Sequence, residues 1–156
     1  MRELRGDIWN RYDDGQWIVL TTNGTVRNDG AAVMGRGIAL QAAQRMPDLP
    51  FRLGDRIHVQ GNRTHAFTQL RLFTLPVKIR WQDPASPTLI RQSVVELVKL
   101  VDLAHLTDVY MVRPGCGNGG LEWRVVKPLI ADVLDERFAI VEKYDQDPLA
   151  QSERAK

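Results

Sequence analysis

The feature that most constrains the fold is a buried strand that runs through a glycine-containing loop into a helix. Residues Trp17–Thr22 carry an apolar run that is typical of a strand covered on both faces. Gly30, Gly35 and Gly37 follow, and a run of good helix formers over residues 38–46 stops at Pro47. The chain therefore passes here from sheet to helix over a loop whose small residues let a ligand approach the backbone.

A loop of this kind is suited to phosphate, because the first N–H groups of a helix point outward at the positive end of its dipole. The glycine spacing nevertheless matches neither G-x-G-x-x-G nor G-x-x-x-x-G-K-[ST]. A tight connection without a ligand explains this segment equally well when it is considered alone.

A second glycine loop lies far along the chain. The predicted strand Asp108–Val112 leads into Arg113–Leu121, and a helix is expected from Glu122 to Leu134. Ligands of open α/β sheets bind beyond the carboxyl ends of the strands, so both loops are expected to face one crevice. Two backbone-lined loops facing each other suit an extended diphosphate better than a single phosphate.

The remaining pattern alternates strands with helices, which predicts a three-layer α/β/α sandwich around a mixed, mostly parallel sheet. We expect a polar turn at Arg11–Gln16, an irregular segment at Pro76–Pro87 and a long helix at Thr88–Leu106. The other expected strands are Met1–Trp9, Arg56–Gln60 and Phe138–Val141, with one or two further strands over His65–Leu70 and Arg71–Leu75. One domain is expected over residues 1–145, followed by a polar tail over 146–156.

Composition limits the classes of function. The chain has 21 lysines and arginines against 19 aspartates and glutamates, without a basic block, so its charge neither requires nor excludes nucleic acid. Cys116 is the single cysteine, which excludes a disulfide within the chain, and the three histidines are not spaced as a metal site. Neither an apolar leader nor a membrane-length segment is present, so we expect a cytoplasmic protein without a membrane partner.

Three segments together resemble the macrodomains, which bind ADP-ribose. They are Gly6-Asp7-Ile8, residues 33–39 in the first loop, and Gly115–Leu121 followed by Trp123 and residues 127–130. The resemblance implies that Asp7 accepts a hydrogen bond from the adenine amino group and that the loops bind the phosphates and distal ribose. The first loop is longer than usual through residues 25–29, so its ribose-facing asparagine is Asn23 or Asn28. The implied ligand-binding residues are Asp7, Ile8, Asn23, Asn28, Val33, Met34, Gly35, Arg36, Gly37, Ile38, Gly115, Cys116, Gly117, Asn118, Gly119, Gly120 and Leu121.

Within the macrodomains, the chain most resembles a branch that contains antitoxin macrodomains, which reverse DNA ADP-ribosylation, and the human terminal ADP-ribose glycohydrolase. A lysine precedes the long helix in that branch, and Lys78 occupies the matching position here. The human relative has an aspartate in place of Gly119, whereas the antitoxins share the glycine. To act as a nucleophile or general base, the Lys78 amine must be neutral, and Arg80 is a nearby cation that would favour the neutral form.

The resemblance implies an ADP-ribosyl glycohydrolase that removes ADP-ribose from a modified nucleobase or protein side chain, with Lys78 as the catalytic residue. The alternatives are a reader of ADP-ribose without turnover and an ADP-ribose-1″-phosphate phosphatase. The expected partner is ADP-ribose or an ADP-ribosylated macromolecule, with ADP-ribosylated DNA among the candidates. We expect a monomer that needs no cofactor or metal. Cys116 is expected to pack the loop, and Trp81 to pack or, if exposed, to stack on a nucleobase.

Overall fold

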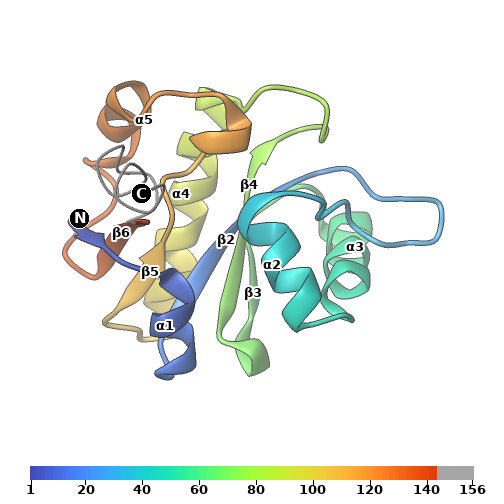
Figure 1. Cartoon of the computed structure of the whole chain (residues 1–156), viewed down its shortest axis with the longest axis horizontal. Coiled ribbons are helices and arrows are strands. Elements are labelled where there is room, and N and C mark those ends of the chain that lie inside the picture. The colour runs from blue at the N-terminus through green and yellow to red at the C-terminus, as the bar shows by residue number, and fades with distance from the viewer. Residues whose placement is uncertain (144–156) are drawn as a thin grey trace, which may run out of the picture.

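The computed structural model describes residues 1–143, which form one six-stranded sheet with helices on both faces (Figure 1). The spatial order of the strands is β1-β6-β5-β2-β4-β3, and every neighbouring pair is parallel except β3 with β4. The strands are β1 (Arg2–Arg5), β2 (Trp17–Asn23), β3 (His65–Phe67), β4 (Leu72–Lys78), β5 (Val109–Met111) and β6 (Phe138–Glu142). The helices are α1 (Ile8–Asp13), α2 (Gly37–Arg45), α3 (Leu49–Gln60), α4 (Pro87–Leu103) and α5 (Trp123–Ile130), with short 3₁₀ helices η1 (Thr68–Leu70) and η2 (Gly117–Gly119).

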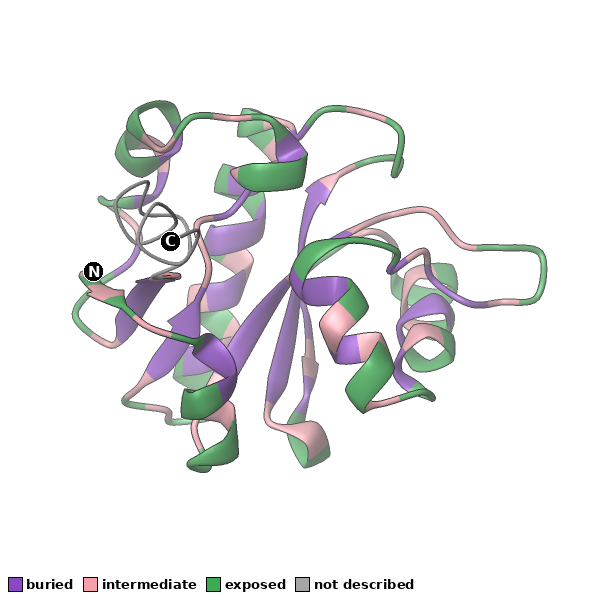
Figure 2. Cartoon of the chain, in the orientation of Figure 1, coloured by how far each residue is buried: buried purple, intermediate pink, exposed green. Residues whose placement is uncertain are grey.

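The predicted three-layer sandwich is confirmed by two cores, one on each face of the sheet. Alternate residues of β2 point to opposite cores: Ile18 and Leu20 into one, Val19 into the other. Helices α1, α2 and α3 cover the first core, and α4 and α5 cover the second. The buried residues, purple in Figure 2, therefore follow the central strands and the inner faces of the helices. The central strands β2, β4, β5 and β6 are mostly apolar because helices bury both of their faces.

The first expected strand and the turn after it were partly wrong. Only Arg2–Arg5 is extended, and Ile8–Asp13 forms α1 where Ile8 and Trp9 were assigned to the strand. Asp7 is the N-cap, because its side chain accepts a hydrogen bond from the Trp9 N–H at 2.9 Å. The helix buries Ile8 and Trp9 against the sheet, which accounts for the apolar pair.

The strand expected at Arg56–Gln60 was also wrong, because these residues complete helix α3. Leu49 and Leu53 are buried and Ile57 packs partly against the same core, which is a four-residue spacing. Val59, which the alternating pattern would bury, is 77% exposed. Pro50 lies in the first turn of the helix, where its missing N–H costs nothing.

The later elements agree with expectation apart from their ends. Pro76–Lys78 was assigned to the irregular segment but continues β4, while the strand expected over His65–Leu70 divides into β3 and η1. Strand β3 is three residues long, so β4 extends beyond it at Pro76, where proline's missing N–H breaks no ladder with β3. The long helix, the fifth strand and the last strand all form. The polar tail expected over 146–156 lies outside the described residues.

Within residues 1–143 none of the helices combines the length and the apolar character that crossing a bilayer requires.

Helix α3 provides a test of how tightly the first glycine loop is packed. A methyl group on Gly54 would lie 1.9 Å from the Gly30 carbonyl oxygen, and that oxygen is backbone and cannot rotate away. We predict that Gly54→Ala lowers the free energy of unfolding by about 2 kcal/mol or more, despite alanine's better helix propensity. The exposed Val59→Ala in the same helix is the control, with a change within about 0.5 kcal/mol. Equal urea midpoints for Gly54→Ala and the parent would contradict this packing.

Candidate functional site

One cavity of about 740 Å³ lies at the carboxyl ends of the parallel strands, and both glycine loops line it. Its size falls in the range of small-molecule sites. The lining begins at Ile8 beside β1, crosses the ends of β6, β5 and β2, and reaches Lys78 at the end of β4. The expectation that both loops face one crevice is confirmed. The other lining residues are Thr21, Thr22, Asn23, Thr25, Arg27, Val33, Met34, Gly35, Arg36, Gly37, Ile38, Ala39, Gln41, Val77, Trp81, Val112, Arg113, Gly115, Cys116, Gly117, Asn118, Gly119, Trp123, Val141, Glu142 and Lys143.

Asn23 closes the first loop at its base. Its Oδ1 accepts a hydrogen bond from the Thr25 N–H at 2.9 Å, and its Nδ2 donates to the Val33 carbonyl at 3.0 Å. Between these points the chain forms a narrow excursion whose two sides meet in a bridge between Val26 and Ala32. Asn28 is exposed in the turn of that excursion and does not line the cavity. Of the two candidate asparagines, the structure therefore places Asn23 at the cavity.

The first loop ends at the N-terminus of α2, which has no side-chain cap. The first N–H groups of a helix have no partner within the helix, so an uncapped start beside a cavity is a site for an anion. Gly37 has a φ of 58°, and a methyl group on it would lie 3.2 Å from Asn118 Nδ2. The two loops therefore meet across the cavity at Gly37 and Asn118.

The second loop is compact because glycine occupies its closest approaches. A methyl group on Gly115, whose φ is 78°, would lie 2.5 Å from Ile90 Cδ1. Within the loop, η2 also begins without a side-chain cap. Gly115 through Gly119 line the cavity as expected, whereas Gly120 and Leu121 do not. Leu121 instead packs against the core that α4 and α5 cover, and its N–H donates to the Gly115 carbonyl.

Lys78 lies where β4 ends and joins the second loop to the segment after β4. Its Nζ donates to the carbonyl oxygens of Asn118 and Trp81, each at 3.4 Å. Arg80, the expected nearby cation, pairs instead with Asp83 at 3.2 Å and does not line the cavity. The structure therefore puts Lys78 in the site and leaves Arg80 outside it.

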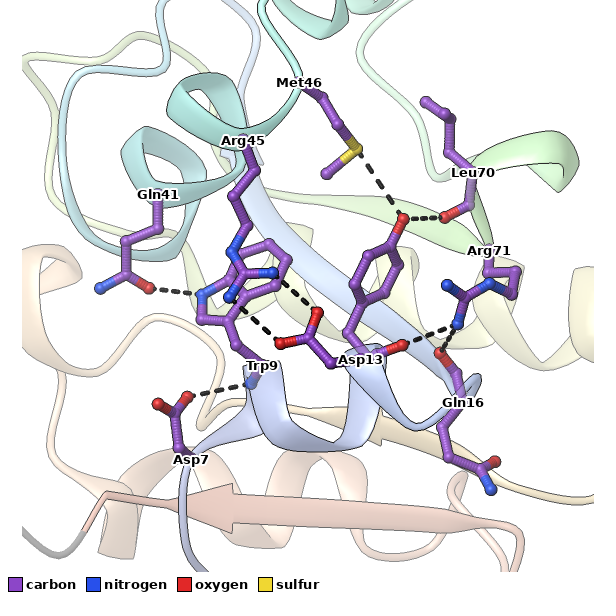
Figure 3. A network of polar contacts seen from close by, with 10 residues as sticks. Asp7, Trp9, Asp13, Gln16, Gln41, Arg45, Met46, Leu70 and Arg71 are labelled. Atoms are coloured by element: carbon purple, nitrogen blue, oxygen red, sulfur yellow. Dashed lines mark hydrogen bonds and ion pairs between the residues drawn. The ribbon is translucent and has the colours of Figure 1, made fainter.

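The opposite end of the cavity is formed by α1 and α2, which Trp9 and Arg45 connect (Figure 3). The Trp9 Nε1 donates to Gln41 Oε1 at 2.8 Å, and the Arg45 guanidinium lies 4.3 Å from the Trp9 ring centroid. This connection fixes Ile8 and Gln41, both of which line the cavity. Asp7 is exposed and is not a lining residue, and one of its carboxylate oxygens accepts the capping hydrogen bond.

Sequence reasoning missed a polar group at the ends of β5 and β6. Arg113 donates to Glu142 at 3.1 Å and lies 5.1 Å from the centroid of Trp123, and all three residues line the cavity. Among the described residues, the buried Arg113 Nε finds no hydrogen-bond partner. The rule that ligands bind beyond strand ends could have found Arg113 and Glu142, which lie at or just beyond two predicted strands.

Comparisons with known proteins agree with this geometry, although no family model matches the chain. The chain is 29% identical over 126 residues to a DNA ADP-ribosyl glycohydrolase of Thermus aquaticus, an alignment that covers 75% of this chain and 35% of that protein. It superposes on the macrodomain of Thermus aquaticus DarG with a TM-score of 0.70 and 27% identity, covering 90% of this chain and 95% of that one. It also matches Thermosipho africanus DarTG in complex with ADP-ribose, with a TM-score of 0.68 and 20% identity, over 87% of this chain and 40% of that one. This last likeness shows the fold alone.

The fold and the two facing loops identify the chain as a macrodomain. Among the macrodomains it is similar to the macrodomain of DarG. The chain spans about a third of the length of the glycohydrolase that it matches.

The structure gives Cys116 a testable reactivity. Burial raises the pKa of the Cys116 thiol, while the nearby Arg113 charge opposes this rise more weakly. We predict that iodoacetamide at about pH 7.5 labels Cys116 more slowly than glutathione, because less thiolate is present. In urea the exposed thiol should react at the rate of a free thiol, which provides the internal control. Labelling of the folded protein as fast as that of glutathione would refute the prediction.

Proposed function

We propose that the cavity binds ADP-ribose across the carboxyl ends of the strands. One observation carries the proposal: two loops with uncapped helical N-termini line one cavity that ends at Lys78. The backbone N–H groups of the loops would hold the diphosphate. The adenosine would lie toward Asp7 and Ile8, and the distal ribose toward Asn23 and Lys78. This orientation puts the C1″ carbon, where a modified target is attached, at the Lys78 end.

We further propose that the chain hydrolyses the bond between C1″ and an acceptor atom of ADP-ribosylated DNA. The similarity to a DNA ADP-ribosyl glycohydrolase supports both the reaction and the acceptor. In the overall change, water supplies a hydroxyl to C1″ and a proton to the released nucleobase. We propose that the chain acts as a monomer in the cytoplasm.

Lys78 would act either by attacking C1″ or by taking the proton from the attacking water. Its hydrogen bonds to the carbonyl oxygens of Asn118 and Trp81 hold the amine at the end of the cavity. The glycine loops would fix the ribose against this amine, so that positioning contributes to the rate. A reader without turnover would use the same cavity but would not depend on Lys78 for any chemistry.

We predict that Lys78→Ala reduces hydrolysis of ADP-ribosylated DNA at least about 100-fold and leaves ADP-ribose affinity within a few fold. Lys78→Arg keeps the positive charge, yet a guanidinium does not lose its proton, so this variant should be equally impaired. Lys99→Ala, on the exposed surface of α4, is the control.

These rates should be measured side by side on ADP-ribosylated DNA, ADP-ribosylated protein and ADP-ribose-1″-phosphate. Parent-like hydrolysis by Lys78→Ala would remove the lysine from the mechanism. A parent protein that binds ADP-ribose but cleaves none of the three substrates would be a reader.

The adenine role proposed for Asp7 can be separated from its capping role. Asp7→Ala should lose both the cap, at about 1 kcal/mol of stability, and about tenfold in ADP-ribose affinity. Asp7→Asn retains a capping oxygen but puts an amide on the carboxylate's other position, so its affinity should fall while its stability stays close to that of the parent. Calorimetry and thermal unfolding give the two readouts. Unchanged affinity in Asp7→Asn would remove the adenine role.

A further inference from the structure

Trp81 lies at the Lys78 end of the cavity and is the lining tryptophan with the largest free surface. Its side chain belongs to the lining, yet the residue is 44% exposed. Lys78 Nζ donates to the Trp81 carbonyl at 3.4 Å, so the residue that carries the indole adjoins the proposed reacting end. It lies where a group attached to C1″ would leave the cavity.

The backbone under this indole is held on both sides. The Trp81 N–H donates to Thr25 Oγ1 at 3.0 Å, and the Gly24 N–H donates to the Ile79 carbonyl at 3.1 Å. The segment after β4 is therefore fixed to the first glycine loop. The backbone that carries the ring is therefore held at the rim, which lowers the entropy cost of ordering this residue against a flat partner.

The indole ring of each of the other three tryptophans contacts an arginine or an aromatic side chain, whereas the Trp81 ring has no such contact within residues 1–143. Trp9 lies under Arg45, Trp17 contacts Phe73, and Trp123 lies under Arg113. The nitrogens of Trp9 and Trp123 also donate to side chains. An unpartnered aromatic face beside a ligand cavity is a surface on which a planar group can stack.

Two cations on the facing loop complete this rim. Arg27 and Arg36 are exposed, line the cavity and have no ion-pair partner within residues 1–143. Arg27 follows Thr25 by two residues, so it stands on the loop to which Trp81 is hydrogen-bonded. Arg36, at the start of α2, lies nearer the proposed diphosphate. Arg27 is thus the guanidinium placed to meet a phosphate outside the cavity.

We propose that Trp81 and Arg27 form the acceptor subsite, in which the modified nucleobase of single-stranded DNA stacks on the indole and Arg27 contacts a flanking phosphate. The inference rests on the proposed function and names the part of the substrate beyond ADP-ribose. A base stacked on a protein ring cannot also stack within a duplex, so the site selects single strands or extruded bases. A carboxylate acceptor of a protein has no aromatic ring to stack on the indole and would gain little from it.

The test measures binding in the Lys78→Ala background, where turnover does not consume the probe. The probes are free ADP-ribose, an ADP-ribosylated single-stranded oligonucleotide and an ADP-ribosylated glutamate peptide. Trp81→Ala should weaken oligonucleotide binding about tenfold and leave the other two probes within about twofold. Trp81→Phe should recover most of the loss, because a phenyl ring also stacks. Phe51→Ala removes an aromatic that is 49% exposed and lies outside the cavity, so it serves as the control.

Arg27→Ala is the second variant for this binding experiment. It should weaken oligonucleotide binding and reduce the dependence of log Kd on log salt concentration by about 0.7, the value for one contact with a single strand. Oligonucleotide affinity unchanged by Trp81→Ala, or an equal loss on all three probes, would overturn the acceptor subsite while leaving ADP-ribose binding intact. Failure of the Lys78→Ala background and the parent alike to bind free ADP-ribose would instead overturn the proposed function.

Discussion

The site depends on hydrogen bonds that fix the segment after β4 between the two glycine loops. On one side Gly24 and Thr25 bind Ile79 and Trp81, and on the other the Ala85 N–H donates to the Gly119 carbonyl at 3.0 Å. Lys78 adds a third connection through its Nζ. The loops leave the paired strands β2 and β5, and this segment connects them again at the cavity. The segment after β4 therefore sets the width of the cavity and also positions Lys78 in it.

The sheet topology explains why residues so distant in sequence share one site. Parallel strands bring their carboxyl ends to a common edge, so β1, β6, β5, β2 and β4 deliver their following residues to the same place. The glycine loops follow β2 and β5, which are neighbours at the centre of the sheet. A diphosphate held between them, as proposed, would have β6 and β1 on one side and β4 on the other. An extended ligand with a nucleoside at one end and a second sugar at the other fits this order.

The sequence was informative where local chemistry decides the structure. The two strand–glycine–helix units were predictable because their apolar runs, glycines and helix formers act over neighbouring residues. Helix α3 was mistaken for a strand because Arg56–Gln60 alternates, whereas burial of Leu49 and Leu53 on one helical face decided the outcome. Ile8 and Trp9 were misplaced for a similar reason: two adjacent apolar residues do not distinguish a strand end from a first helical turn.

Within the site, the same division applies. Lys78 and the loop glycines were predicted from the family motif and line the cavity, whereas Asn23 could be separated from Asn28 only by the hydrogen bonds that close the loop. Arg113 and Glu142 follow two predicted strands, whereas Trp123 joins them through contacts that single-sequence patterns do not carry.

The contact between Gly54 and the Gly30 carbonyl makes the first loop and helix α3 inseparable. A loop of this length cannot be transplanted into a related scaffold by itself, because the recipient helix would need a residue without a side chain at the matching turn. Recombination that exchanges residues 24–36 alone would meet steric conflict, whereas exchange through the end of α3 would carry the complementary surface along. The chain from β2 to the end of α3 would therefore have to be exchanged as one unit.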